Sequence, residues 1–262
     1  MNHEAPRSAA DQTYLHQGAD GADRLTAAFD VLRGVLSECG GTPWTVSQAR
    51  QEESLLEWAG RVGALLNAED IFPFTVKGGM EHDLLHPLRD GRLWKATKYN
   101  YFGLTPGLEL DLVPSGADAR RFHLWESGIY HYLERLTLQN ELFGQINRLE
   151  GFVISDKVIT AVTSQPSYRL EPMTQSQIDE WFVGQRFVPI TTAAYYRAED
   201  NVAVFDAHDK NVAWNGSAVV PFDVIPCRPE GGFLEFIEKT LQAGESLCAV
   251  RTTRTTDSFT HA

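Results

Sequence analysis

The chain has 262 residues, enough for one large domain or two small lobes, and 43% of them are apolar, which allows a packed core. Its 35 acidic residues outnumber 23 basic ones, and the resulting net charge of -12 argues against a nucleic-acid surface and a polybasic membrane anchor. An anionic ligand is still compatible with this balance, because one basic group and a divalent cation can hold it locally.

The three cysteines, Cys39, Cys227 and Cys248, are far apart and form no CxxC pair, so neither a zinc ribbon nor a disulfide framework is indicated. The first residues lack the apolar region of a secretory signal, and no apolar run is long enough to span a bilayer. We therefore expect a soluble, cytoplasmic protein with reduced thiols that binds neither nucleic acid nor a membrane.

The N-terminal part predicts two helices after a polar, disordered stretch over residues 1–20. Apolar residues recur with a helical period at Leu25, Phe29, Leu32 and Leu36, and a pair of glycines ends this helix. A second amphipathic helix follows in residues 45–66, with Ser47 or Thr45 as its cap.

The pattern then changes to short strands separated by turn residues. Residues 72–79, 81–88 and 91–98 predict a three-stranded antiparallel meander with a hairpin turn at "RDG". Residues 101–121 resemble a loop, and a long helix is predicted for residues 123–144.

The second half predicts mostly strands. Two strands come first, and a helix over residues 174–187 with Thr174 as its cap follows them. A β region and a last helix close the pattern. The predicted strands of this half are residues 148–155, 157–167, 193–199, 201–206, 211–216 and 217–225, and the last helix is residues 231–244.

This order of helices and strands indicates an α+β fold with two lobes. The first five strands, with a helix between the third and fourth, form one antiparallel five-stranded lobe. The expected parts are a disordered N-terminus at 1–20, N-terminal helices at 21–68, the N-lobe at 69–165, a reduced C-lobe at 166–250 and a polar tail at 251–262.

Chemistry-bearing residues gather at the ends of the last strands. Asp206 ends one strand, Asn211 follows five residues later, and Asp223 ends another strand twelve residues further on. Carboxylate and amide oxygens are ligands that Mg²⁺ accepts. With the preceding lobe, this spacing is similar to that of protein kinases and aminoglycoside phosphotransferases. The resemblance implies that Asp206 is the base and that Asn211 and Asp223 hold Mg²⁺.

The same resemblance implies a lysine on the third strand and a helix glutamate that holds it. Lys95 fits the first role, with Lys98 as a competing choice. Glu134 on the long helix fits the second, and Glu126 and Glu141 are alternatives at similar helical phases. Lys95 would contact the α- and β-phosphates of ATP.

Two further sets of residues complete the implied nucleotide site. Gly78 and Gly79 offer a backbone that phosphate oxygens can approach closely, although a full G-x-G-x-x-G is absent. Backbone groups of Thr163, Ser164 and Gln165 would meet the adenine ring.

A narrower family resemblance rests on the stretches "GGMEHDLL", "YLERLTLQNELFG", "RLEGFVIS", "VTSQPS", "AYYRAED" and "DAHDKN" followed by "PFDV". Together they resemble the kinase domain of bacterial and phage polyvalent proteins, a kinase of the serine/threonine/tyrosine type. The resemblance covers roughly residues 70–226. It implies ATP and Mg²⁺ as cofactors and a hydroxyl acceptor, either a protein Ser, Thr or Tyr or a small molecule.

The sequence departs from the usual kinase pattern near the predicted chemistry. "VFD" stands where His-Arg-Asp is usual, and "FDV" replaces Asp-Phe-Gly. Only 39 residues follow Asp223, which leaves no room for the large helical substrate platform of typical protein kinases. The nucleotide site is therefore better supported than the acceptor site. A pseudokinase or nucleotide-sensing interaction module, and a protein AMP-transferase on the same fold, stay open as alternatives.

Simpler interpretations also stay open. A strand-ending aspartate often forms a turn, and Lys95 and Glu134 are also compatible with a solvated surface. His82 and His86 lie in a strand-like segment, where a four-residue spacing does not suit zinc. A phosphoesterase cluster built on "DAHD" lacks the further ligands of a two-metal site, so His208 is expected to orient the catalytic loop.

Overall fold

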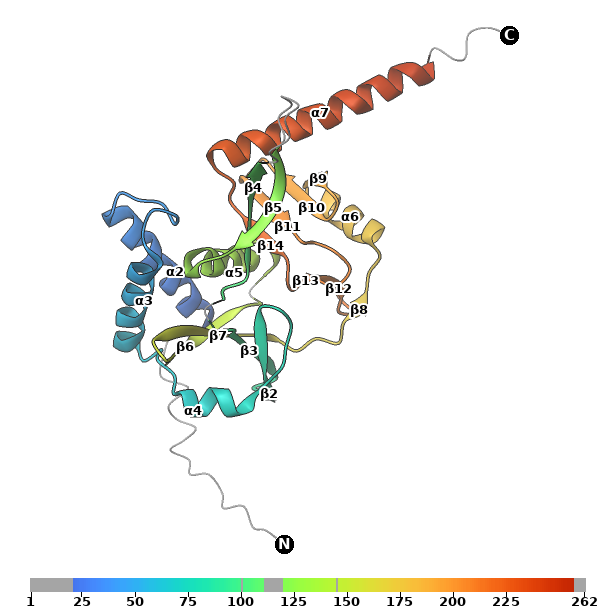
Figure 1. Cartoon of the computed structure of the whole chain (residues 1–262). Coiled ribbons are helices and arrows are strands. Elements are labelled where there is room, and N and C mark those ends of the chain that lie inside the picture. Colours follow the sequence, from blue (N-terminus) through green and yellow to red (C-terminus); the bar gives the residue numbers. More distant parts are fainter. Residues whose placement is uncertain (1–20, 100, 111–119, 145, 257–262) are drawn as a thin grey trace. The chain divides into compact units, whose positions relative to one another are not determined.

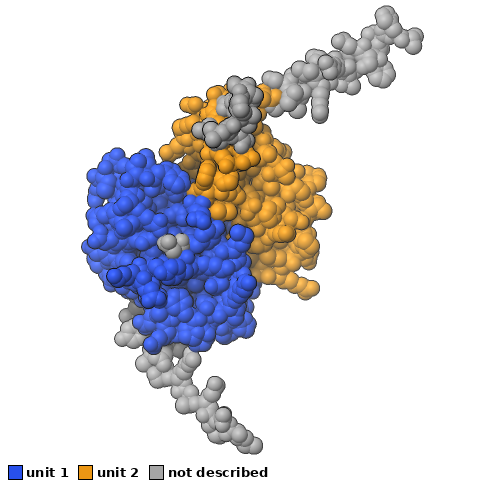
Figure 2. Space-filling model, viewed as in Figure 1, with its two compact units in different colours: residues 1–103, 126–167 blue, residues 104–125, 168–262 orange. Residues whose placement is uncertain are grey.

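The computed structural model describes residues 21–99, 101–110, 120–144 and 146–256 and divides the chain into two compact units (Figure 2). Unit 1 comprises residues 1–103 and 126–167, and unit 2 comprises residues 104–125 and 168–262. The predicted boundary near residue 165 lies close to the division at Ser167. The assignment of 104–125 to unit 2 was not predicted. The segment 1–20, predicted to be disordered, lies outside the described residues.

The N-terminal helices belong to the core of unit 1 (Figure 1). They are α2 (Gly21–Glu38), α3 (Gln48–Val62) and the short α4 (Ala68–Ile71). Ser47 caps α3 by accepting a hydrogen bond from the backbone N–H of Arg50, and Gly63 ends it in the left-handed region at φ 68°. Helices α2 and α3 both pack on the long helix α5 (Ile129–Phe143). This packing buries a shared apolar cluster that includes Leu25, Leu32, Leu55, Tyr132, Leu133 and Phe152.

The sheet of unit 1 has five strands in the order β1-β2-β3-β7-β6, with every described neighbour antiparallel. The predicted meander is present, and Asp90 and Gly91 take positive φ in its hairpin turn. The five-stranded sheet is thus as predicted. Its strands are β1 (Thr75–Val76), β2 (His82–Arg89), β3 (Arg92–Thr97), β6 (Arg148–Ser155) and β7 (Val158–Pro166).

The described residues of the segment 101–121, which we expected to be a loop, contain one strand and the first two residues of a second strand instead. Strands β4 (Leu104–Leu110) and β5 (Arg120–Glu126) pair with each other. Pro106 and Gly107 inside the first strand obscured its alternating pattern, because both residues are depleted in strands. Tertiary packing outweighs this low propensity, since Leu104, Phe122 and Leu124 pack against the apolar core of unit 2.

Within its described residues, unit 2 contains the remaining strands and two helices. Helix α6 (Gln175–Gly184) begins with the predicted cap Thr174, whose side chain and that of Gln177 form a capping box. Two sheets follow, with the orders β14-β11-β10-β9 and β13-β12-β8. Their strands are β8 (Glu171–Pro172), β9 (Val188–Thr191), β10 (Ala194–Arg197), β11 (Val202–Phe205), β12 (Val212–Trp214), β13 (Val219–Pro221) and β14 (Ile225–Cys227).

The C-terminal part differs from the prediction in two places. The segment 217–225, expected as one strand, is divided into β13 and β14, which belong to different sheets, and Asp223 lies in the break. Helix α7 (Gly231–Thr256) continues into the segment 251–262 that we expected to be a polar tail, and residues 257–262 lie outside the described part.

At the level of fold class, the structure agrees with the prediction of an α+β protein, because helices combine with several antiparallel sheets. None of the helices in the described ranges combines the length and apolar composition that crossing a bilayer requires.

Candidate active site

The turn after β11 brings two of the predicted residues into direct contact. The Asn211 side-chain nitrogen Nδ2 donates to the backbone carbonyl of Asp206 at 2.8 Å and to its carboxylate Oδ2 at 2.8 Å. Asp206 has φ 58°, a left-handed conformation that few residues other than glycine adopt, although aspartate is enriched there. The amide of Asn211 therefore stabilises both the backbone and the carboxylate of the residue predicted to be the base.

Asn211 also connects this turn to Asp223. Its backbone carbonyl accepts hydrogen bonds from the N–H groups of Phe222 at 3.0 Å and Asp223 at 3.4 Å. The hairpin β12–β13 returns the chain to this point, because Val212 pairs with Pro221. The sequence spacing of Asp206, Asn211 and Asp223 thus becomes a spatial cluster within unit 2.

His208 lies inside the same turn and orients the Asp206 carboxylate. Its Nδ1 accepts a hydrogen bond from the Lys210 N–H at 3.1 Å, which places the ring proton of a neutral imidazole on Nε2. Nε2 is 3.3 Å from Asp206 Oδ1. His208 therefore lies beside the carboxylate of the predicted base, and its role in orienting the catalytic loop stays a prediction. Among the residues that the structure describes, no group of three or more His, Cys, Asp or Glu side chains is arranged to share a metal ion.

A second set of contacts, which was not predicted, supports the turn from outside. The Ala207 N–H donates to the Ala193 carbonyl at 3.0 Å, and the Ala207 carbonyl accepts from Gln175 Nε2 at 3.3 Å. The same Gln175 nitrogen contacts Asp179 Oδ1 at 2.9 Å and the Tyr195 hydroxyl at 3.0 Å. Helix α6 thereby holds the residue that follows Asp206.

Tyr195 is the buried centre of that support. Its hydroxyl donates to the Asp179 carboxylate, and its ring stacks on Phe182 with centroids 4.2 Å apart. Burial, followed by the hydrogen bond to Asp179, raises the pKa of Tyr195 well above its ordinary value. The phenol therefore stays protonated and keeps donating. A capped helix with a polar first turn is a general pattern, so these partners could not be found from spacing alone.

Unit 1 carries the residues predicted to contact the nucleotide. Lys95 lies on β3 between Leu84 of β2 and Thr163 of β7, and Glu134 lies on α5; both side chains are partly buried. Their pairing stays a prediction. Of the alternatives to Glu134, Glu141 lies near the end of α5, whereas Glu126 ends strand β5 and so does not share a helical phase with it.

The two predicted loop glycines lie between β1 and β2. A Cβ atom on Gly78 would lie 2.2 Å from the His82 carbonyl oxygen, so glycine is required for this close approach. The Gly79 carbonyl accepts a hydrogen bond from Lys98 Nζ at 2.5 Å. Lys98, the competing choice for the strand lysine, therefore contacts the loop itself.

The residues predicted to meet adenine lie on β7. Thr163 and Ser164 are buried and pair with β3 on one side and β6 on the other, so their backbone groups belong to the sheet. The recorded pairing with β6 ends at Ser164, and Gln165 pairs only with Leu93 of β3. Among Thr163, Ser164 and Gln165, only the backbone of Gln165 lies beyond the end of the recorded pairing between β7 and β6.

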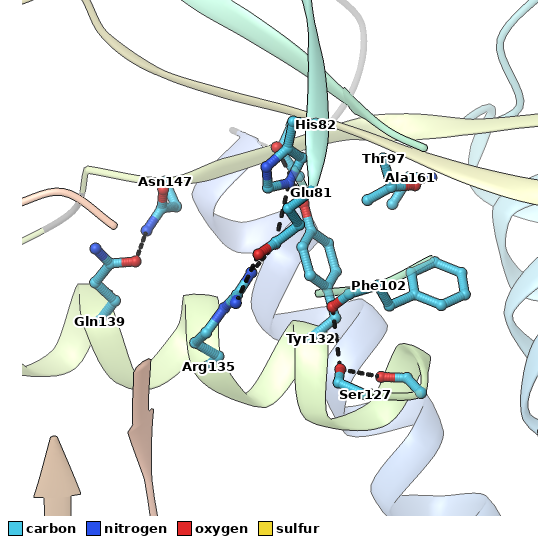
Figure 3. Close-up of polar contacts among 12 residues, drawn as sticks. Glu81, His82, Thr97, Phe102, Ser127, Tyr132, Arg135, Gln139, Asn147 and Ala161 are labelled. Carbon is cyan, nitrogen blue, oxygen red and sulfur yellow. Dashed lines mark hydrogen bonds and ion pairs between the residues drawn. The ribbon is translucent and has the colours of Figure 1, made fainter. Parts of the chain in front are cut away.

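A polar network next to the glycine loop was not predicted as such (Figure 3). Arg135 on α5 donates through Nη1 to Glu81 Oε2 at 3.0 Å and through Nη2 to Glu81 Oε1. Glu81 Oε1 is also 3.3 Å from Nε2 of His82, and that nitrogen lies 2.9 Å from the Tyr132 hydroxyl. His82 is buried, and its ring joins the same network.

In a comparison with known protein families, one family model matches the segment that contains the Asp206 turn. Residues 121–225 match the family model for a serine/threonine/tyrosine kinase found in polyvalent proteins. The match confirms the family resemblance, although it covers less than half of the chain and begins well after residue 70. Comparison with curated proteins and with solved structures finds no match.

The range matched by the family model covers some of the predicted site residues and not others. It supports a kinase-like function in general terms. Glu134, residues 163–165, Asp206, Asn211 and Asp223 lie inside it, whereas Gly78, Gly79 and Lys95 precede it.

Proposed function

We propose that the chain is an ATP- and Mg²⁺-dependent phosphotransferase that moves the γ-phosphate to a hydroxyl acceptor. The observation that carries this proposal is the cluster of Asp206, Asn211 and Asp223 in unit 2, inside the segment that matches the kinase family. Positioning and charge neutralisation account for most catalysis of phosphoryl transfer; oriented oxygen atoms would supply the first directly and the second through the Mg²⁺ that they would hold.

The donor atoms of this cluster suit Mg²⁺. Asn211 Nδ2 donates to two oxygens of Asp206 and lies 3.5 Å from His208 Nε2; the two oxygen acceptors orient the amide and direct its carbonyl Oδ1 away from Asp206. That oxygen and the exposed Asp223 carboxylate would hold the metal, since Mg²⁺ prefers oxygen ligands and retains several waters. The bound ion would neutralise negative charge on the phosphates.

Asp206 would accept the proton of the attacking hydroxyl. Its carboxylate is 36% exposed and is held by Asn211 at Oδ2 and by His208 at Oδ1. Two contacts fix its orientation while its exposure leaves room for a third partner. This combination suits a general base, which must reach the acceptor proton within hydrogen-bond distance.

Residues of unit 1 would bind the nucleotide. Lys95, held by Glu134, would contact the α- and β-phosphates, and the backbone at Gly78 and Gly79 would approach phosphate oxygens. The adenine would meet the backbone near Gln165, where the sheet pairing of β7 with β6 has ended.

The test is a thermal shift with ATP, with and without Mg²⁺, on the wild type and on Asp223→Ala. A ligand present at 100 times its Kd adds about 2.7 kcal/mol of stability. We expect a Mg²⁺-dependent rise in Tm that is lost in Asp223→Ala and kept in Glu180→Ala, which removes an exposed carboxylate from helix α6. A wild type whose Tm does not respond to ATP under either condition would contradict the proposal.

The position of a radioactive label then separates the alternatives. Transfer of label from the γ-phosphate indicates a kinase, and transfer from the α-phosphate indicates a protein AMP-transferase. A Mg²⁺-dependent Tm shift without transfer of either label to any acceptor indicates a pseudokinase or nucleotide sensor.

A further inference from the structure

A buried ion pair connects helix α5 to the segment that follows the two loop glycines. Glu81 lies two residues after Gly79, and both of its carboxylate oxygens accept from the terminal nitrogens of Arg135 (Figure 3). The Arg135 side chain is 7% exposed and that of Glu81 is 19% exposed. A two-point contact between a guanidinium and a carboxylate fixes orientation as well as distance.

Several neighbours leave the Glu81 side chain little freedom. Gly103, at φ 78°, approaches it so closely that a Cβ atom there would lie 2.3 Å from the carboxylate. The Glu81 carbonyl accepts from the Lys98 N–H at 3.0 Å, and Lys98 Nζ binds the Gly79 carbonyl. Both ends of the segment from Gly79 to Glu81 are therefore attached to the sheet or to α5.

The adjacent residue makes a second connection to the same helix. His82 Nε2 lies 2.9 Å from the Tyr132 hydroxyl, which is 3.3 Å from Thr163 Oγ1 on β7. The Arg135 guanidinium lies over the Tyr132 ring, 5.3 Å from its centroid. Helix α5, the glycine loop and strand β7 thus share one polar network in unit 1.

We propose that Glu81 and Arg135 are positioning residues that hold the Gly78–Gly79 loop in the conformation that receives the nucleotide phosphates; this inference rests on the proposed function. Two glycines allow the loop many conformations. Restricting these conformations when the nucleotide binds costs entropy, which weakens the affinity for the nucleotide. The ion pair restricts the loop before the nucleotide arrives. Arg135 also neutralises a carboxylate that would otherwise repel phosphate from two residues away.

A comparison of single and double variants separates positioning from stability. Arg135→Met leaves a largely buried carboxylate, 19% exposed, without its main partner, so Tm falls by about 5–10 °C. The double variant Glu81→Leu/Arg135→Met removes both charges, and Tm recovers most of that loss because a matched apolar pair replaces a buried ion pair at little cost. The Kd for ATP stays about tenfold weaker than in the wild type in both variants.

The matched control is the exposed pair Glu57 and Arg61 on α3, whose side chains are 69% and 63% exposed. Glu57→Leu/Arg61→Met removes the same two charges and leaves both Tm and ATP affinity unchanged. Recovery of ATP affinity together with Tm in the Glu81/Arg135 double variant would overturn the inference, because the pair would then be structural.

Amide hydrogen exchange over residues 77–83 gives a readout that does not depend on ATP. We expect about tenfold faster exchange there in both the single and the double variant, and unchanged exchange in the control. A wild type that fails to bind ATP removes the proposed function and with it the phosphate part of this inference. Faster exchange would in that case still establish the pair as the group that orders the loop, and unchanged exchange would overturn that as well.

Discussion

Two loops of this molecule are held in place by opposite means. The glycine loop of unit 1 is fixed by the buried ion pair of Glu81 and Arg135 and by the contact between His82 and Tyr132. The turn that carries Asp206 in unit 2 is fixed mainly by amide and backbone groups, and its carboxylate stays 36% exposed. A group that must meet solvent or substrate cannot also be enclosed by its supports.

Because of this difference, we expect mutations in the glycine loop and in the Asp206 turn to have different effects. Removing one partner from a buried polar network leaves another polar group without water or a hydrogen bond, which costs folding free energy. Removing a partly exposed carboxylate leaves its neighbours in contact with solvent, so folding changes little. We therefore expect single changes in the unit 1 network to lower stability as well as ATP affinity, and changes in the Asp206 turn to affect mainly turnover.

The largest effect is expected for Asp206→Asn. Asparagine tolerates the left-handed conformation at φ 58° and can still accept a hydrogen bond from Asn211, but it cannot take a proton from the acceptor. Turnover of γ-phosphate transfer should fall by roughly 10²–10⁴-fold, while the Kd for ATP and Tm stay unchanged. Steady-state kinetics alongside a thermal melt measure both, and full activity in this variant would remove Asp206 from the mechanism.

The next effect concerns His131, on the same helix as Arg135. Its ring lies 4.5 Å from that of Trp44, and burial lowers the pKa of His131 from 6.5 to about 4. Between pH 6.5 and pH 4, His131 binds a proton in the unfolded chain but not in the folded chain. The contribution of His131 to the free energy of unfolding is therefore constant above pH 6.5 and becomes unfavourable as the pH falls toward 4. This one group accounts for a loss of about 3 kcal/mol.

His131→Phe checks this expectation, because phenylalanine keeps an aromatic ring beside Trp44 but cannot be protonated. Urea unfolding at several pH values between 7 and 4 gives the free energy of unfolding of both proteins. As the pH falls, the free energy of unfolding should decrease more for the wild type than for His131→Phe. Parallel pH curves for the two proteins would show that His131 is protonated alike in the folded and unfolded states.

Tyr132→Phe tests the buried network without touching a charge. The lost hydroxyl contacts both His82 and Thr163, so two buried polar groups lose a partner, and the free energy of unfolding should fall by about 1–3 kcal/mol. Adding Thr163→Val should recover part of the loss, since one of the two groups is then apolar. Denaturant titration of the single and double variants measures this, and a single variant as stable as the wild type would contradict it.

The smallest effect is expected for Gln175→Ala, which removes the side chain that binds the Ala207 carbonyl. Loss of one hydrogen bond to the turn should lower turnover roughly threefold to tenfold and leave Tm nearly unchanged. Gln177→Ala is the matched control, because it removes the capping-box partner of Thr174 on the same helix. That control should lower stability by about 1 kcal/mol and spare turnover; the reverse pattern would contradict the assigned roles.

The sequence predicted what depends on neighbours along the chain. Spacing predicted that Asp206 and Asn211 act together, and the two lie in contact because the turn between them is only six residues long; the roles of Asp206, Asn211 and Asp223 stay predictions. It did not identify Arg135 as the partner of Glu81, because 54 positions separate them and a helix arginine is most often solvated. The β4–β5 hairpin was missed for a related reason: its pairing is stabilised by apolar partners that come much later in the sequence.

That hairpin has a consequence for how the chain is made. Phe122 on β5 packs against Phe205, Phe233 and Phe236, with ring centroids 5.6, 6.1 and 5.0 Å apart. The ribosome must therefore add 83 residues after Phe122 before the first of these rings exists, and the others follow only with helix α7. Until then the nascent chain carries an uncovered aromatic strand in a hairpin, a natural substrate for chaperones that recognise exposed apolar segments. The strand that ends at Phe205 leads directly into the Asp206 turn, so the chemistry of unit 2 would be acquired only late in synthesis.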